Sequence, residues 1–120
     1  MYTGVSVGST EIIALAQNST KFSQAIMRRD KCAGFAGMLL TISAGSVNIT
    51  QQCGLSDSAV FFSPVDKFSN SLGVVCSLFS AGTYWIQYDP VLAPFARFRV
   101  TEANVASTTV TFTPMMLEDR

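Results

Sequence analysis

The amino-acid sequence predicts an all-β fold, a single β-sandwich of about eight to nine antiparallel strands with jelly-roll or Greek-key connections. Three observations support this prediction. Segments that alternate polar and apolar residues, rich in Val, Ile, Thr and aromatic residues, recur along most of the 120 residues. Turn residues separate these segments about every eight to twelve positions, as in known sandwiches. No stretch combines helical periodicity with capping residues.

Four strands are expected in the first half of the chain. Alternation predicts strands at residues 10–16 and 22–29, and the more apolar residues 35–43 suit a central strand that is buried on both sides. Residues 44–46, Ala-Gly-Ser, predict a turn. Residues 47–53 alternate again. The expected inward face of this strand carries Val47, Ile49, Gln51 and Cys53.

The second half predicts a short aromatic strand at residues 59–63, after a loop at 54–58, and a long polar loop at 64–73. Strands follow at 74–80, 83–88, 95–102 and 108–117, with a turn at 81–82 between the first two. Two of these strands have clearly different faces. Ala96, Phe98 and Val100 lie opposite Phe95, Arg97 and Arg99, and Val110 and Phe112 lie opposite Thr109, Thr111 and Thr113.

The alternating segments define one domain, residues 10–117, between two different ends. Residues 1–9 are small and uncharged and predict a flexible N-terminal arm, while residues 118–120 form a short charged end. The first twenty residues lack the basic start and long apolar stretch of a secretory signal. We therefore expect a protein that is made in the cytoplasm and not exported.

Charged residues make up 13% of the chain, against about a quarter in an average soluble domain. Two interpretations are open. The 25 Ser and Thr residues supply polarity without charge on exposed strands. Alternatively, part of the surface is buried by other subunits, because interface cores are depleted in charge. The second interpretation points to the uncharged arm at residues 1–8 and the apolar residues 114–117.

The composition argues against several functions. The chain has no histidine, which excludes Ser/His and Cys/His catalytic pairs and His-ligated zinc. Eight basic residues balance eight acidic ones, so no surplus of positive charge predicts nucleic-acid binding. The longest apolar stretch, residues 33–40, is too short to cross a bilayer. No cofactor or metal motif is present, and we expect no enzyme activity.

The three cysteines, Cys32, Cys53 and Cys76, follow neither a zinc-ligand nor a disulfide-framework spacing. We expect all three to be free, buried thiols. The alternatives are a Cys53–Cys76 disulfide or a disulfide between chains that forms in oxidising surroundings.

Residues 47–117 carry a pattern of known proteins. A strand ending in Gln51-Gln52-Cys53, the loop Gly54-Leu55-Ser56-Asp57-Ser58, the aromatic pair Phe61-Phe62 and Pro64-Val65-Asp66 are followed by Gly82-Thr83-Tyr84-Trp85, by Phe95-Ala96-Arg97-Phe98-Arg99 and by a Thr-Val-Thr strand. This order resembles small β-sandwich accessory proteins of tailed-phage virions. Ser58 departs from the pattern, because those loops often carry glycine there.

The resemblance implies a non-enzymatic virion structural protein of the capsid decoration, cement or head-fibre-base type. It implies assembly in the host cytoplasm, binding to the phage major capsid protein or another virion protein, and a homo-oligomer, with a trimer favoured. No cofactor, nucleic acid or membrane is expected. From the residues, we predict assembly contacts at the two ends and at the arginines, namely Met1, Tyr2, Val5, Val7, Arg28, Arg29, Arg97, Arg99, Met115 and Met116.

A carbohydrate-binding or receptor-contacting module of a phage tail or fibre is the alternative function. Trp85 or Tyr84 would then stack on a sugar ring. Other aromatic residues, Tyr88, Phe61 and Phe62, are candidates for the same surface, although most aromatic side chains of a small sandwich belong to its core.

Overall fold

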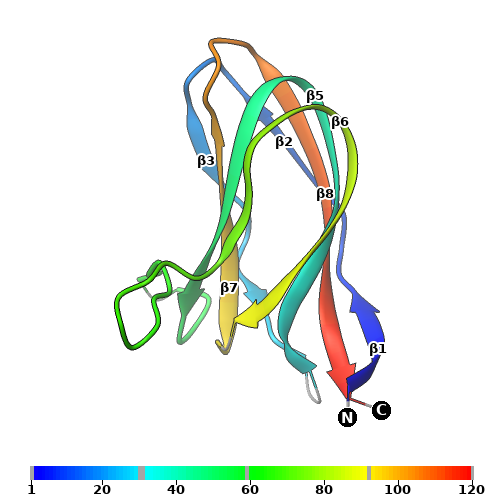
Figure 1. Ribbon diagram of the computed structural model, residues 1–120, viewed down its shortest axis with the longest axis vertical. Coiled ribbons are helices and arrows are strands. Elements are labelled where there is room, and N and C mark those ends of the chain that lie inside the picture. The colour runs from blue at the N-terminus through cyan, green and yellow to red at the C-terminus, as the bar shows by residue number, and fades with distance from the viewer. Residues whose placement is uncertain (1, 30–31, 59, 92, 120) are drawn as a thin grey trace.

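A computed structural model describes residues 2–29, 32–58, 60–91 and 93–119, and these residues contain strands and no helix (Figure 1). The prediction of an all-β protein is confirmed. Every strand pair is antiparallel. The strands are β1 Tyr2–Val7, β2 Glu11–Leu15, β3 Thr20–Phe22, β4 Ile26–Met27, β5 Cys32–Gly54, β6 Val74–Val91, β7 Phe95–Glu102 and β8 Thr108–Asp119.

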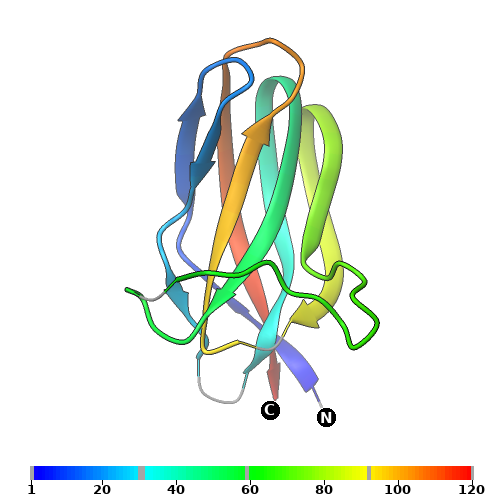
Figure 2. The same ribbon diagram turned by 90° about the vertical axis from the view of Figure 1, so that its left-hand side faces the viewer.

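The strands form one antiparallel sheet that curls around the core. Residues 32–42 of β5 pair with β8, and residues 47–54 pair with β7. β6 follows β5 along both parts, and the two strands arch over together at one end of the molecule (Figures 1 and 2). We call the strands around β8 the β8 half, which contains β1, β2, β8 and the paired parts of β5 and β6. The strands around β7 form the β7 half.

The predicted turns at residues 44–46 and 81–82 are wrong as strand boundaries, because both strands continue through them. Pairing resumes on each side of the bend, from Ile42 with Gly82 to Ser46 with Ser80. Gly45 has a φ of 72°, and a Cβ atom there would lie 2.5 Å from Oε2 of Glu102. The glycine therefore bends the strand where no other residue fits.

Two other predicted strands differ from the structure. Residues 22–29 form no single strand, because Ser23 leaves the pattern: its hydroxyl accepts a hydrogen bond from the amide of Phe98, and β3 ends before it. Residues 59–63 form only an isolated bridge between Phe62 and Cys53, and residue 59 lies outside the described residues. The loop is thereby attached to the sheet without adding a strand to it.

Both ends of the chain belong to the β8 half. In the predicted arm, residues 2–7 form β1, in which Val5 pairs with Leu117 and Val7 with Met115. In the predicted charged end, Glu118 pairs with Gly4 and Cys32. The N- and C-termini lie together at the end opposite the arches (Figure 1).

The core follows the alternation of the sequence. Phe98 makes edge-to-face contacts with Phe35 and Phe112, each with ring centroids 5.6 Å apart, and so connects β7 with β5 and β8. The predicted apolar faces of β7 and β8 are buried, as are Val47, Ile49 and Gln51 of β5. Cys53 was expected to be buried on the same face of β5 but is only partly buried. The buried side chains around them are Met38, Leu40, Ile42, Ala96, Val100 and Val110.

A buried carboxylate at the arched end accepts hydrogen bonds from three separate parts of the chain. Glu102 is 1% exposed. Its Oε1 atom accepts hydrogen bonds from the amides of Asn18 and Ala106, and its Oε2 atom accepts from those of Ser46 and Asn104. These bonds, led by the one from Asn18, lower the pKa of Glu102 to about 2.

The cysteines are free thiols, so the alternative Cys53–Cys76 disulfide is not formed. Burial raises the pKa of Cys76 to about 11 and also raises the pKa of Cys53. At pH 8 the Cys76 thiol should therefore react with a disulfide reagent roughly a hundredfold more slowly in the folded protein than in urea. Equal rates in the two states, or fewer than three thiols after unfolding, would contradict this.

Candidate assembly interface

The outward face of the β8 half consists of cross-strand rows. In one row, Thr111 lies between Ile12 and Thr41, and Thr41 pairs with Thr83. These positions point outward because the alternate ones, such as Val110 and Phe112, are buried in the core.

Two further rows extend the same face. Leu39 lies between Thr113 and Trp85 in the first, and Met115 pairs with both Val7 and Gly37 in the second. We call this surface the uncharged face, because none of its residues carries a charge. The uncharged face comprises Val5, Val7, Ile12, Leu39, Thr41, Thr83, Trp85, Gln87, Thr111, Thr113 and Met115.

Large apolar side chains are exposed on this face. Ile12 is 69% exposed and Trp85 is 64% exposed, and Leu39 lies exposed between the threonine rows. Hydroxyl pairs satisfy one another across the strands, with 2.7 Å between Oγ1 of Thr10 and Oγ1 of Thr113. The surface therefore combines exposed apolar side chains with paired hydroxyl groups, which suits burial against protein.

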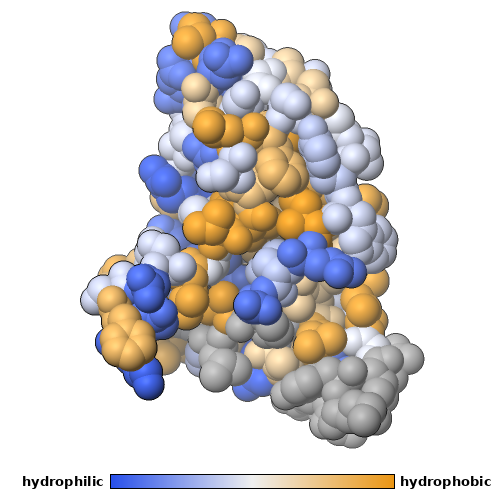
Figure 3. Space-filling view, in the orientation of Figure 1, coloured by the Kyte–Doolittle hydropathy of each residue, from blue (hydrophilic) through white to orange (hydrophobic). Residues whose placement is uncertain are grey.

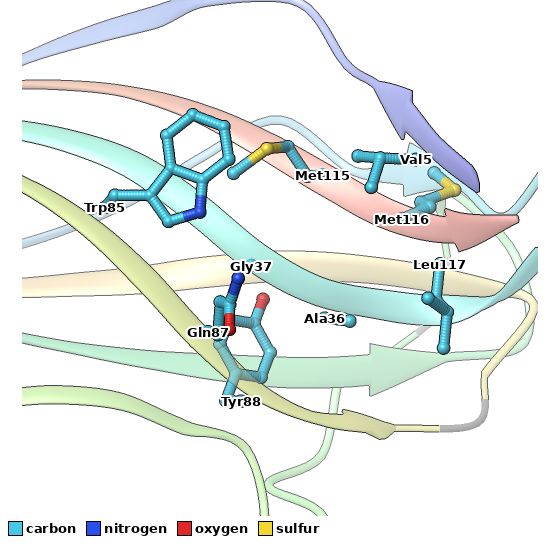
Figure 4. Close-up of a pocket in the computed structure, with 9 residues that line it drawn as sticks. All are labelled: Val5, Ala36, Gly37, Trp85, Gln87, Tyr88, Met115, Met116 and Leu117. Carbon is cyan, nitrogen blue, oxygen red and sulfur yellow. The ribbon is translucent and has the colours of Figure 1, made fainter. Parts of the chain in front are cut away.

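A groove of about 290 Å³ lies on this face between β1, the C-terminal part of β8, and the adjoining parts of β5 and β6 (Figure 4). Trp85 and Met115 lie side by side at one end of the view, and Val5 and Leu117 lie at the other. Gly37 lets the strands approach, since a Cβ atom there would lie 2.9 Å from the carbonyl oxygen of Ile86.

Tyr88 lies at the inner wall of the same groove. Its buried hydroxyl has no hydrogen-bond partner within the described part of the chain, and burial raises its pKa. The hydroxyl is therefore neutral at ordinary pH.

The structure brings together three of the predicted contact residues. Val5 and Val7 are exposed, whereas Met115, which pairs with Val7, is 6% exposed and lies buried beside them. Met116 is 2% exposed and belongs to the core. Met1 lies outside the described residues, and Tyr2 is described only as part of β1.

The four predicted arginines lie elsewhere. Arg28 donates to the carbonyl oxygen of Cys32, and Arg29 donates to the hydroxyl of Ser6, near the end that carries the termini. Arg97 and Arg99 belong to the outward face of the β7 half. Among the predicted contact residues whose side chains are described, there is therefore no single common surface.

Tyr84 and Trp85 cannot form one stacking platform, because neighbouring strand residues point to opposite sides of the sheet. Tyr84 packs against Phe79 with ring centroids 4.8 Å apart, and its hydroxyl donates to the carbonyl oxygen of Ser80. Trp85 points outward onto the uncharged face. Of the two, only Trp85 has an exposed ring.

Sequence reasoning missed a second exposed apolar surface, in the loop between β5 and β6. This loop projects from the molecule at the lower left of Figure 1, and hydrophobic side chains are visible on it in Figure 3. The segment was predicted as a polar loop because of its many polar residues, although large apolar residues recur in it. The exposed ones are Leu55, Val60, Phe62, Val65, Phe68 and Leu72.

No family model and no curated protein matches the chain. Within the described ranges, no cluster of three or more His, Cys, Asp or Glu side chains is placed to hold a metal ion. The same residues include no helix with the length and apolarity required to span a membrane.

Proposed function

We propose that the protein is a non-enzymatic structural subunit of a tailed-phage virion, which self-associates through the uncharged face and decorates or cements the capsid lattice. The observation that carries this proposal is the set of adjacent cross-strand rows that contain exposed apolar side chains and no charge. A solvated sheet face normally carries Lys and Glu, which prevent association.

The exposed area is consistent with a stable interface between copies. Val5, Val7, Ile12, Leu39 and Trp85 together expose on the order of 400 Å² of mainly apolar surface. A standard interface buries about 800 Å² on each partner, of which roughly 60% is apolar. The threonines and Gln87 between these side chains supply the polar remainder. The resemblance to phage accessory proteins favours a trimer.

The loop between β5 and β6 supports attachment to a second protein. Its exposed apolar residues project from the end of the molecule opposite the arches. One subunit therefore has one apolar surface for copies of itself and another for a lattice. The capsid as the lattice, and the virion as the location, come from the resemblance of residues 47–117.

The test is to purify virions that encode this chain and count its copies by quantitative mass spectrometry. We expect copies on the order of hundreds per particle, as a symmetric lattice requires. A handful of copies would instead place the protein at the neck or the tail tip, and its absence from particles would refute the virion proposal.

We also propose that the curled sheet is a two-layer sandwich with jelly-roll connections. The pairing supports this, because β8 lies between β2 and β5 while β7 lies between β3 and β5, and both β5 and β6 cross from one half to the other at the arches. A crystal structure with two separate four-stranded layers would agree, whereas a closed barrel would not.

A carbohydrate-binding or receptor-contacting function is the second candidate, because Trp85 is 64% exposed beside the groove. An exposed indole next to Gln87 and Thr83 suits stacking on a sugar ring with hydrogen bonds at its edge. A glycan array should then identify a ligand whose binding is lost in Trp85→Ala. An array without ligands, or a variant that binds as tightly as the parent, would exclude this function.

A further inference from the structure

The outward face of the β7 half carries an arginine that its neighbours hold in place. Cζ of Arg97 lies 4.0 Å from the ring centroid of Phe22 and 4.8 Å from that of Phe61. Phe22 belongs to β3, on one side of β7, and Phe61 follows β5, on the other side. Nε of Arg97 donates to Oε1 of Gln52 at 2.8 Å. Two ring contacts and one hydrogen bond thus orient the guanidinium.

The remaining donors of this arginine have no partner. Among the described residues, neither the Nη groups of Arg97 nor the guanidinium of Arg99 makes a hydrogen bond or an ion pair. Arg99 is exposed two positions further along the same face, where it pairs with Thr50 and Phe22. The face therefore presents two positive charges that no acidic side chain of the described ranges pairs with.

We propose that Arg97 and Arg99 form a binding site for a carboxylate on an acidic segment of a partner protein. A planar carboxylate accepts two parallel hydrogen bonds from the oriented guanidinium, and Arg99 adds a second positive charge beside it. The aromatic contacts reduce the rotamer entropy that such a pair loses at an ordinary surface. A nucleic-acid backbone fits less well, because the chain has no net positive charge to follow it.

This site goes beyond the proposed assembly function and lies on the opposite half of the sheet from the uncharged face. Phe22, Phe61 and Gln52 are positioning residues, because they orient the guanidinium and leave its Nη groups available. Conservative changes at these positions should weaken binding while the charge of the site stays the same.

The test is a low-salt NMR titration of the ¹⁵N-labelled protein with a blocked Glu-Asp-Glu peptide, followed through the backbone amide signals of β7, which every variant retains. We expect saturable chemical-shift changes in the parent protein. The dissociation constant for the peptide should be at least roughly tenfold larger in Arg97→Gln, Arg97→Lys and Arg99→Gln. Lys67→Gln, which removes a positive charge from an exposed loop, is the matched control and should bind like the parent.

Several results would overturn the site. The first is the absence of a saturable chemical-shift change, and the second is unchanged peptide affinity in the arginine variants. An equal loss of affinity in Lys67→Gln, or equal shifts with a blocked Gln-Asn-Gln peptide, would also contradict the proposal. Inorganic phosphate at the same ionic strength forms a separate arm, and an equal response to it would show an unselective anion site. Backbone spectra of each variant establish that it is folded. None of these results depends on self-association or on virions.

Discussion

Glu102→Gln is expected to destabilise the folded protein more than any surface substitution. The four backbone amides that donate to the carboxylate come from residue 18 between β2 and β3, residue 46 at the bend of β5, and residues 104 and 106 between β7 and β8. The amide group of glutamine has nearly the same shape, but its nitrogen cannot accept a hydrogen bond. Two of the four amides therefore lose their acceptor, and the arched end loosens.

The same carboxylate predicts how stability depends on pH. The pKa of Glu102 is about 2 in the folded protein, below the value of about 4.3 for an ordinary glutamate. The folded state thus binds the proton less readily than the unfolded state. The contribution of Glu102 is fully present above about pH 5 and is lost as the pH falls from there towards 2.

Urea unfolding between pH 2 and 7 measures both effects. The parent should lose stability progressively below pH 5, and Glu102→Gln should be less stable at pH 7 and less sensitive to acid. Glu11→Gln is the matched control, because among the described residues the Glu11 carboxylate accepts one hydrogen bond, from the amide of Gln24. Equal stability of the Glu102 and Glu11 variants at pH 7 would contradict the account.

Trp85→Arg is expected to separate the subunits without unfolding them. The substitution places a charge in the middle of the uncharged face, where a partner copy would have to desolvate it. We expect self-association to weaken by roughly a hundredfold or more. The side chain is largely exposed in the single chain, so the stability of the monomer should change by no more than about 0.5 kcal/mol.

Size-exclusion chromatography with light scattering compares this variant with its control. Leu55→Arg adds the same charge at a residue that is 82% exposed in the loop between β5 and β6, away from the uncharged face. Trp85→Arg should elute as a monomer, and Leu55→Arg should keep the parent mass. Dissociation of both variants alike, or of the loop variant alone, would move the interface away from Trp85.

The strands whose two faces differ in polarity could be predicted from the sequence. β7 has the predicted bounds, Phe95–Glu102, because Ala, Phe and Val alternate with Arg and Thr along it. The continuation of β5 and β6 through their bends could not be predicted. The same residue types occur in a bend within one strand and in a turn between two strands. Whether β5 pairs again after Gly45 depends on the neighbouring strand β6, which the local sequence of β5 does not contain.

The candidate interface was predictable only in part, for a similar reason. Val5, Val7 and Met115 were expected at contacts because they lie in uncharged ends of the chain. Ile12 and Leu39 were not, because each stands next to an identical residue, Ile13 or Leu40, that is buried instead. Alternation cannot decide which member of such a pair faces inward, since both fit the core.

Sedimentation equilibrium of the unmodified, purified protein tests the central claim most directly. The claim is that copies of this chain associate through the uncharged face with no other component present. Between about 1 and 100 µM, we expect one defined oligomer, with a mass that is a small multiple of 12.9 kDa. A mass of 12.9 kDa across this whole range would contradict the claim.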